Sequence, residues 1–254
     1  DLGNYTGIVN IAFHVPSGNI DGWRLYIDRV IIEENPTCFE PNTISTVNTS
    51  TTSVEFSWTD NNSTTPQQWE LLVLPFGSPE PEYNLPVGTG NLVTSNPATI
   101  LNLSPTTQYI SFIRAICSDT DRSNWSQGFV FNTLPSNDEC IDAIVVPVNS
   151  SSTCNQIVYG TISSSSASIE ALPAVCNGTA DYDVWFQFTA TANAHTIALK
   201  NIVGSTTNLN HAVYTGECTN LTPLYCSYAN ENSSLANNLT VGQTYFIRIY
   251  SNSN

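Results

Sequence analysis

The side chains that could carry out chemistry in this chain are three histidines, seven cysteines and the carboxylates of its loops. The histidines lie in separate runs typical of β-strands, without a second ligand at metal-binding spacing, so we expect them to be structural; they are His14, His195 and His211. The sequence contains no C-x-x-C pair, H-E-x-x-H, G-x-S-x-G, P-loop or dinucleotide-binding motif. Carboxylate pairs for glycoside hydrolysis do not stand out in so acidic a chain. We therefore predict that these residues have no enzyme activity.

The charge of the chain is strongly negative. Its 254 residues include 21 acidic and 6 basic side chains, for a net charge of −15. Such a surface repels phosphate backbones, which argues against nucleic acid as a partner. Seven cysteines without zinc-site spacing favour disulfides and an extracellular location. We expect no membrane span, since no apolar run approaches the ~20 residues that one needs. The absence of Met favours a processed piece of a longer protein.

The pattern of apolar residues is that of β-strands. Apolar and β-branched residues alternate in short runs separated by Pro, Gly, Asn and Ser, and no segment keeps a helical period. Prolines between apolar runs at 33–38 and 133–137 indicate linkers between β modules. We therefore predict an all-β chain of tandem β-sandwiches, with divisions at residues 1–35, 36–135 and 136–254.

The first piece is predicted to hold two strands, Ile8–His14 and Trp23–Ile32, which are too few for a stable domain. The second strand reads Gly22-Trp-Arg-Leu-Tyr-Ile-Asp28-Arg-Val30 and resembles the closing strand of a bacterial jelly roll of the MAM-like, surface-anchored type. The resemblance implies that residues 1–35 are the C-terminal hairpin of a truncated jelly roll. It leaves two roles open for Asp28, as a ligand of structural calcium or as the end of a cross-strand polar row.

The middle piece, residues 36–135, carries the motifs of a fibronectin type III module. Val54-Glu-Phe-Ser-Trp58 places Val, Phe and Trp on one face, and Trp69-Glu-Leu-Leu-Val73 follows as a strand of the next sheet. Leu103-Ser-Pro-Thr-Thr-Gln-Tyr109 resembles the corner at which a tyrosine bonds the backbone of the preceding turn. The resemblance implies a small extracellular sandwich with both of these tryptophans in its core.

Side-chain parity in the strand after this corner predicts a disulfide. Alternate residues of a strand share a face, so Cys117 lies on the core face with Tyr109. Cys38, at the start of the module, is its natural partner, and this cross-link stabilises the fold by ~4.5 kcal/mol in the chain-entropy model. The opposite face indicates either a contact with an adjoining module or scattered surface residues, and we adopt the contact as a hypothesis. Its apolar members, beside Arg114, are Leu72, Leu74, Ile110, Phe112 and Ile116.

The third piece resembles the pre-peptidase C-terminal family of bacterial jelly rolls. The matching segments are Asn137-Asp-Glu-Cys-Ile-Asp-Ala-Ile144, Ala180-Asp-Tyr-Asp-Val-Trp-Phe-Gln-Phe188, Val213-Tyr-Thr-Gly-Glu-Cys218 and Leu239-Thr-Val-Gly-Gln-Thr-Tyr-Phe-Ile-Arg-Ile-Tyr250. The resemblance implies either a structural calcium ion, which takes six to eight oxygen ligands, or acidic solvated loops. The candidate ligands are Asn137, Asp138, Glu139, Asp181 and Asp183. No other cofactor is expected.

The third piece holds five cysteines, so at least one of them lacks a partner within it. Cys218 and Cys226, eight residues apart across a short turn, form the easiest pair. The connectivity of Cys140, Cys154 and Cys176 stays open. Relatives add a strand, often with a cysteine, after the region that ends at residue 251, so we expect this sandwich to lack its last strand. A strand donated by a neighbouring subunit is another way to complete it.

Three functions remain open. The resemblances imply a non-catalytic segment of a large secreted or cell-surface bacterial protein, adhesive or structural in role, with the type IX system as a candidate export route. Its partners would be neighbouring β-sandwich modules of the same or an adjacent chain, and surface glycans or proteins. A second function is an accessory region of a secreted protease or polysaccharide hydrolase. A third is a carbohydrate-binding module, whose aromatic candidates are Trp23, Trp125, Tyr182, Tyr225 and Tyr228.

Overall fold

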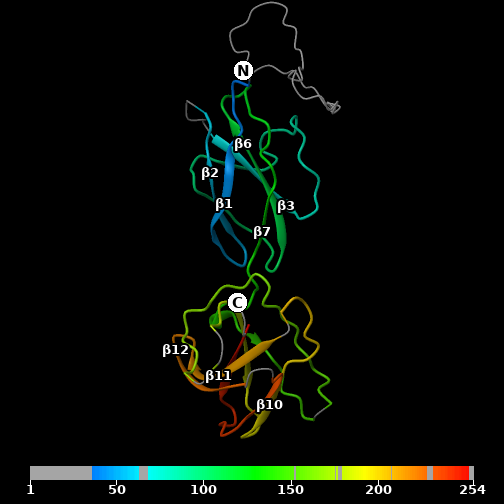
Figure 1. The fold of residues 1–254 in the computed structure, drawn as a ribbon, viewed down its shortest axis with the longest axis vertical. Helices are drawn as coiled ribbons and strands as arrows, with labels where there is room; N and C mark the ends of the chain where they lie inside the picture. Colours follow the sequence, from blue (N-terminus) through cyan, green and yellow to red (C-terminus); the bar gives the residue numbers. More distant parts are fainter. Residues whose placement is uncertain are drawn as a thin grey trace, which may run out of the picture.

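In the computed structural model the chain forms two β-sandwiches, placed end to end along the longest axis of the molecule (Figure 1). The structure describes residues 36–62, 68–151, 153–174, 176, 179–206, 208–227 and 231–251. The hairpin predicted in residues 1–35, with Asp28, lies outside the described residues. We name the two bodies the N-terminal sandwich (36–135) and the C-terminal sandwich (136–251). The predicted all-β fold is confirmed, because the described residues form strands and one short 3-10 turn, Cys140–Asp142.

The N-terminal sandwich consists of two antiparallel sheets. The smaller has the strand order β1-β2-β5, and the larger has the order β4-β3-β6-β7. The strands are short and their sequence neighbours lie partly in opposite sheets, which is the arrangement expected for a fibronectin type III-like fold. Their bounds are β1 Asn42–Thr49, β2 Val54–Thr59, β3 Gln68–Pro75, β4 Asn91–Val93, β5 Ala98–Ile100, β6 Gln108–Ile116 and β7 Phe129–Asn132.

The core of the N-terminal sandwich follows from strand alternation. Val54, Phe56 and Trp58 of β2 are buried, while the two residues between them are only half-buried. Trp58 meets Trp69 of the opposite sheet edge to face, with 5.4 Å between ring centroids. Both tryptophans are therefore core residues, as predicted.

A tyrosine corner precedes the central strand of each sandwich. The backbone N–H of Ser104 donates to Tyr109 Oη at 2.9 Å, as the sequence predicts. The backbone N–H of Thr240 donates to Tyr245 Oη at 2.8 Å, with the same spacing of five residues. Each bond ties the turn before the strand to the strand itself, so both central strands enter their sheets in a fixed orientation.

The C-terminal sandwich pairs a five-stranded sheet with a two-stranded one. The larger has the order β12-β11-β14-β9-β8, in which only β8 and β9 run parallel, and the smaller contains β10 and β13. Apolar side chains of β9, β11 and β14 form the core between them. The bounds are β8 Ile144–Val145, β9 Asp183–Thr189, β10 His195–Ala198, β11 Leu209–Glu217, β12 Asn220–Cys226, β13 Ser233–Ala236 and β14 Thr244–Ser251.

The outer face of the four-stranded sheet is covered by its own chain. Phe112 is only 1% exposed and packs with Leu72 under Trp125, next to Leu85 of the connection between β3 and β4. We name this connection, residues 76–90, the N-terminal strap. The hypothesis of a contact surface for an adjoining module is therefore wrong, because the strap and Trp125 already cover much of the predicted row, with Ile116 also buried. Its members were Leu72, Leu74, Ile110, Phe112 and Ile116.

Candidate functional site

A buried arginine holds the N-terminal strap to the sheet. Arg114 of β6 donates to Glu70 Oε2 of β3 from Nη2 (2.7 Å) and Nε (3.0 Å). It also donates to the strap carbonyls of Tyr83 (3.1 Å) and Leu85 (2.8 Å). Its guanidinium lies 4.3 Å from the ring centroid of Trp125. The other oxygen of Glu70 accepts two strap amides, at 2.9 and 2.8 Å. The N-terminal strap is thus fixed by the Arg114–Glu70 pair, in which both carboxylate oxygens accept hydrogen bonds and all three guanidinium nitrogens donate them.

The same arrangement recurs in the C-terminal sandwich. Arg248 of β14 donates to Asp183 Oδ2 of β9 at 2.7 Å, and both side chains are buried. It donates to the carbonyls of Ser168 (3.2 Å) and Glu170 (2.5 Å), and lies 5.5 Å from the ring centroid of Trp185. These carbonyls belong to residues 163–174, which we name the C-terminal strap. In each sandwich an arginine therefore binds a carboxylate on the neighbouring strand, two carbonyls of a strap and a tryptophan.

These arginines were missed by sequence reasoning. Both follow the same dipeptide, in Phe112-Ile-Arg114 and Phe246-Ile-Arg248, shortly after a tyrosine corner. A positive charge within an apolar strand needs a buried carboxylate or carbonyl groups as partners. The repeated Phe-Ile-Arg tripeptide was therefore the signal that could have located both arginines.

The predicted calcium ligands do not fit a calcium ion, and one of them, Asp183, is the partner of the second arginine. The carboxylate of Asp138 accepts bonds from Ser166 N (2.8 Å) and Ser166 Oγ (2.6 Å). The carboxylate of Asp183 accepts bonds from Ser168 N (3.1 Å) and Ser168 Oγ (2.5 Å), in addition to Arg248. Calcium needs oxygens that are free to point at one centre. Here the two buried carboxylates are committed to protein donors, and the guanidinium supplies the positive charge.

The remaining predicted ligands point elsewhere. The side-chain amide of Asn137 donates to the carbonyl of Trp185 at 2.8 Å, and the exposed Asp181 accepts the hydroxyl of Thr179 at 2.6 Å. Glu139 is exposed as well. Partial burial, followed by the nearby carboxylates of Asp138 and others, raises the pKa of Glu139 above its ordinary value. The five residues are thus neighbours without a shared centre.

Three disulfides cross-link the two sandwiches internally. Cys38–Cys117 forms as parity predicts, and it joins the start of the N-terminal sandwich to the end of β6. The C-terminal sandwich contains Cys140–Cys218 and Cys176–Cys226, whereas Cys154 is free. The first ties the 3-10 turn to the β11–β12 hairpin, and the second ties the region after the C-terminal strap to the end of β12.

The predicted pair Cys218–Cys226 is wrong, and the hairpin register explains why. Glu217 lies opposite Asn220, so Cys218 sits in the tight turn between β11 and β12. Cys226 lies opposite Ala212, at the other end of the same hairpin. A short separation in sequence therefore places the two sulfurs at opposite ends of a strand pair. Proximity along the chain was a poor guide because the intervening residues are extended.

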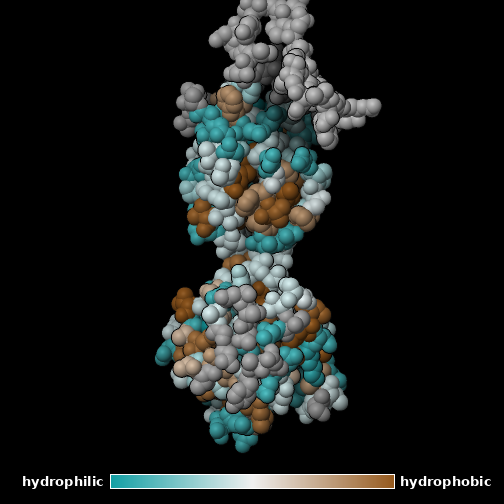
Figure 2. Space-filling model, viewed as in Figure 1, coloured by the Kyte–Doolittle hydropathy of each residue, from teal (hydrophilic) through white to brown (hydrophobic). Residues whose placement is uncertain are grey.

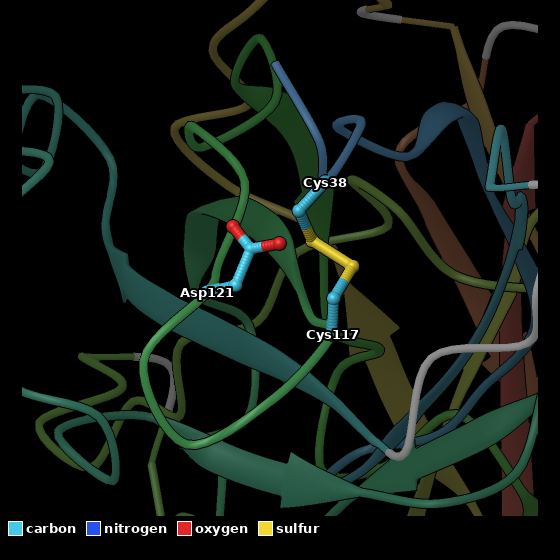
Figure 3. A group of neighbouring side chains, drawn as sticks. All are labelled: Cys38, Cys117 and Asp121. Carbon is cyan, nitrogen blue, oxygen red and sulfur yellow. A yellow bond between two sulfur atoms is a disulfide. The ribbon is translucent and has the colours of Figure 1, made fainter.

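One group of potential metal ligands lies at the top of β6, where Cys38, Cys117 and Asp121 come within 4.8 Å of one another (Figure 3). The two sulfurs are joined in the disulfide, so neither is the thiolate that a metal would require. The carboxylate of Asp121 accepts the hydroxyl of Thr37 at 2.9 Å. This group is therefore a structural cross-link with a neighbouring carboxylate.

The buried histidine of the C-terminal sandwich belongs to a hydrogen-bonded chain. Ser234 Oγ donates to Tyr225 Oη (3.2 Å) and contacts His211 Nε2 at 2.5 Å. With the single hydroxyl proton directed at Tyr225, the oxygen of Ser234 accepts from Nε2 of His211, which requires the imidazole to carry a proton on that nitrogen. Burial lowers the pKa of His211 to about 4. His211 is structural, as expected, and it connects β11 with β12 and β13. His195 accepts the backbone amides of Thr191 and Ala192, both at 3.1 Å.

The aromatic residues considered for sugar binding form no shared platform among the described residues. Trp125 is buried against the guanidinium of Arg114, and its indole N–H donates to the carbonyl of Glu82 at 3.2 Å. Tyr225 is half-buried, and only Tyr182 is largely exposed. Trp23 and Tyr228 lie outside the described residues.

An open groove of about 850 Å³ lies between β12 and β13. It is lined on the β12 side by Leu224 and Tyr225, and on the β13 side by Ser234 and Leu235. The rest of the lining consists of Cys226, Tyr245 and five polar residues, which are Thr215, Glu231, Asn237, Asn238 and Gln243.

The connection between the two sandwiches is anchored at both ends. The amide of Leu134 donates to Ser50 (3.1 Å), and its carbonyl accepts the amide of Thr106 (3.0 Å). On the other side, the carbonyl of Asn137 accepts the amide of Trp185 at 2.8 Å. Only two residues separate these anchors; Pro135 is buried, has a fixed φ and accepts the amide of Asp138 at 3.2 Å. Figure 2 shows the resulting narrow waist between the two bodies.

The match to a protein family covers the C-terminal sandwich. Residues 136–254 match a family model, associated with the type IX secretion system, that is described as galactose-binding domain-like. The C-terminal sandwich therefore resembles a module of secreted or extracellular proteins. The resemblance of this region to the pre-peptidase C-terminal family stays a prediction. No curated protein matches the chain significantly.

The described part of the chain contains no helix with the length and apolar content that crossing a bilayer requires.

Several solved structures match part of the chain. The fibronectin type III domain of human fibronectin type III domain containing protein 3 matches with 16% identity and a TM-score of 0.32, over 41% of this chain and 92% of that domain. A myokine structure matches with 17% identity and a TM-score of 0.30, over 39% of this chain and 99% of that chain. A redesigned β-sandwich protein matches with 21% identity and a TM-score of 0.29, over 37% of this chain and 94% of that chain.

Proposed function

We propose that this chain is a rigid, non-catalytic segment of a large secreted or cell-surface multidomain protein of bacterial type, with an adhesive or structural role. The family match over residues 136–254 and three disulfides support an extracellular location. The fibronectin type III-like N-terminal sandwich is in keeping with a string of β-sandwich modules. Export by the type IX system is the route that the family match favours.

The anchored connection between the sandwiches carries this proposal. A flexible linker would let the two bodies reorient, whereas here Leu134 and Asn137 are both held by backbone hydrogen bonds. Only two residues lie between these anchors, and one of them is a proline, so few rotatable bonds remain. A stiff connection of this kind gives reach to a chain of modules. Weak contacts made by successive modules then add through effective concentration.

Rigidity within each sandwich comes from covalent and ionic cross-links. The straps are fixed by Arg114 and Arg248, and the disulfides join distant parts of each body. Such bodies suit a segment that has to transmit force or resist proteolysis outside the cell. A spacer role beside the catalytic domain of a secreted hydrolase would use the same stiffness, and the domain content of the parent protein distinguishes the two roles.

The experiment that tests this proposal measures distances between the two bodies. Spin labels on the free Cys154 and on a cysteine introduced at the exposed Val47 of β1 report the distance distribution by double electron–electron resonance. We expect a single narrow distribution. Insertion of Gly-Ser-Gly-Ser after Pro135 should broaden it, while the same insertion after the exposed Asp119 should not. A distribution in the native chain as broad as that of the linker variant would refute a rigid segment.

A further inference from the structure

The groove between β12 and β13 lies along the edges of two strands. Leu224 and Tyr225 are consecutive in β12, and Ser234 and Leu235 are consecutive in β13. Consecutive residues of a strand point to opposite faces of its sheet. Ser234 and Leu235 keep a regular register with β10, so a hollow lined by both of them wraps around the edge of β13. On the other side β12 has a bulge, where Leu224 has no partner in β11. We propose that this groove receives an extended peptide strand from another protein, which pairs with the edge of β13; the inference rests on the proposed function and names its partner class.

The number of strands in the two sheets supports this proposal. The larger sheet has five strands, while the smaller one has two among the described residues. Neighbouring strands lie about 4.8 Å apart, so two strands cover less than half the width of five. Part of the core that the smaller sheet leaves uncovered packs against Val146, Val148 and Val158, none of which lies in a strand. The smaller sheet thus has room for a further strand, since β13 pairs only with β10 in the part of the chain that the structure describes.

The floor of the groove is preformed. Ser234 of β13 is bonded to Tyr225 of β12 and to His211 of β11, which fixes the distance between the two sheets at this point. Cys226, which also lines the groove, is held by its disulfide to Cys176. A binding site that is already ordered does not lose conformational freedom when a ligand enters. An incoming strand would therefore meet an edge with a fixed position.

The side chains of the groove define the chemistry of the strand. Leu224 and Leu235 are 45% and 57% exposed, so an occupant with apolar side chains would cover them. Glu231 is the charged residue in the lining, and the chain carries a net charge of −15. The charge of Glu231 and the net charge of the chain favour a basic residue in the partner. They disfavour a second copy of this chain as the partner, because it carries the same negative charge. The fitting occupant is an extended segment that alternates apolar with polar residues and includes a lysine or arginine.

The test uses the full 254-residue chain and a defined probe. The probe is a fluorescein-labelled peptide, Thr-Val-Thr-Val-Lys-Val-Thr-Val-Thr, and its binding is followed by fluorescence anisotropy. One control peptide has the same composition with its valines contiguous, and a second carries N-methyl groups on alternate amides along one edge, which removes its backbone donors there. We expect the probe to bind, and both control peptides to bind about tenfold more weakly or not at all, because pairing along an edge depends on backbone hydrogen bonds and alternation.

Matched protein variants locate the binding. Leu235→Asp should weaken binding of the probe by about tenfold or more, since an apolar contact is replaced by a charge. Val203→Asp is the control, because Val203 is 86% exposed and lies outside the groove lining. Glu231→Lys should weaken binding of the lysine probe about threefold and strengthen binding of a probe with Glu in its place. Thermal melting of each variant shows that the fold is retained.

Four outcomes would overturn the proposal. They are absence of binding at millimolar probe, equal binding of the N-methylated peptide, unchanged binding by the Leu235→Asp variant, and displacement of the probe by a second copy of the chain as dimers form in sedimentation. A fifth result would also overturn it: displacement of the probe by free sugars, together with equal binding of the peptide with contiguous valines, would assign the groove to a saccharide. None of these results affects the distance measurement between the sandwiches, so the proposed rigid segment and the strand site fail independently.

Discussion

The guanidinium of Arg114 lies 2.7 Å from the carboxylate of Glu70, and neither side chain is exposed to solvent. Arg248 and Asp183 repeat this pair, also at 2.7 Å, in a sandwich of different topology. A buried ion pair is rarely more stabilising than well-packed apolar residues of the same size, but the loss of one partner is costly. In both sandwiches the arginine also binds two carbonyls of a strap. The pairs therefore determine where each strap lies on its sheet.

Removal of Arg114 should destabilise the N-terminal sandwich severely. The variant Arg114→Met leaves the carboxylate of Glu70 buried without its countercharge, and we expect a loss of about 3–5 kcal/mol in the free energy of unfolding. Urea denaturation followed by tryptophan fluorescence measures the loss. The double variant Arg114→Met/Glu70→Met has no unpaired buried charge, so part of the lost stability should return. Its N-terminal strap has still lost its anchor, so the amides of residues 76–90 should exchange with solvent faster than in the native chain.

A matched arginine on the same sandwich provides the control. Arg122 lies 5.3 Å from the ring centroid of Tyr83 and forms no ion pair among the described residues. Arg122 is half-buried, and Arg122→Met should change the free energy of unfolding by about 1 kcal/mol, the size of a single cation–π contact and well below the effect of Arg114→Met. Equal effects of Arg114→Met and Arg122→Met would contradict the role of Arg114 in holding the N-terminal strap.

Strand parity explains which features could be predicted from the sequence. Tyr109 and Cys117 are eight residues apart in one alternating run, so the face of one determines the face of the other. The tyrosine corner and the disulfide to Cys38 were predictable for this reason. The Cys218–Cys226 pair failed because proximity in sequence was used where the register of a hairpin decides.

The straps could not be predicted because they have no period. Residues 76–90 contain Pro, Gly and Glu in an order that suggests only a loop. Their position on the sheet depends on contacts from Arg114, on a strand distant in sequence. The outer apolar row was therefore interpreted as a surface, although the chain itself covers much of it. The acidic residues around Asp183 were interpreted as ligands for the same reason, since the opposing charge lies 65 residues away in Arg248.

The stability of the C-terminal sandwich should fall as the pH drops below about 6.5. The pKa of His211 is lowered to about 4 by burial, whereas the unfolded chain protonates this residue near its ordinary value of 6.5. The neutral imidazole therefore contributes fully to the free energy of unfolding when the pH is above 6.5, the pKa in the unfolded chain. This contribution is lost as the pH falls from 6.5 toward 4, the pKa in the folded chain. Between about pH 7.5 and about pH 5 the loss amounts to about 2 kcal/mol by proton linkage.

The pH dependence of His211 can be isolated by substitution. Urea unfolding of the native chain and of His211→Gln at several pH values gives the difference between their slopes in this interval. The Ser234→Ala variant removes a hydrogen bond but keeps the buried imidazole, so it should retain the slope of the native chain. Identical slopes in the native chain and in His211→Gln would exclude this residue as the cause.

Calcium should not stabilise the native chain. Arg248 neutralises Asp183, and Asp138 is satisfied by Ser166, so millimolar calcium or its removal by a chelator should leave the melting temperature unchanged. Arg248→Met leaves the carboxylate of Asp183 buried without its countercharge and should destabilise the C-terminal sandwich, and calcium should not restore the stability, because the predicted ligands share no centre. An upward shift of the melting temperature of the native chain with calcium would show that a metal site exists after all.

The cysteine connectivity can be checked by peptide mapping under non-reducing conditions. We expect the cross-linked peptides Cys38–Cys117, Cys140–Cys218 and Cys176–Cys226, and alkylation of one thiol, Cys154, without reductant. Recovery of a Cys218–Cys226 peptide would contradict the hairpin register on which the structure of β11 and β12 rests.

The two tyrosine corners should make similar contributions to stability. In Tyr109→Phe and Tyr245→Phe the amides of Ser104 and Thr240 lose their acceptor while the aromatic ring is kept. We expect each substitution to lower the free energy of unfolding by about 1–2 kcal/mol, since a partly buried amide is left without a partner. Tyr182→Phe is the matched control, because this side chain is 52% exposed, and it should change the stability by less than about 0.5 kcal/mol. If only Tyr109→Phe destabilised the chain, the second corner would be a geometric coincidence. Equal effects would establish that both sandwiches use the same device to set the entry of their central strands.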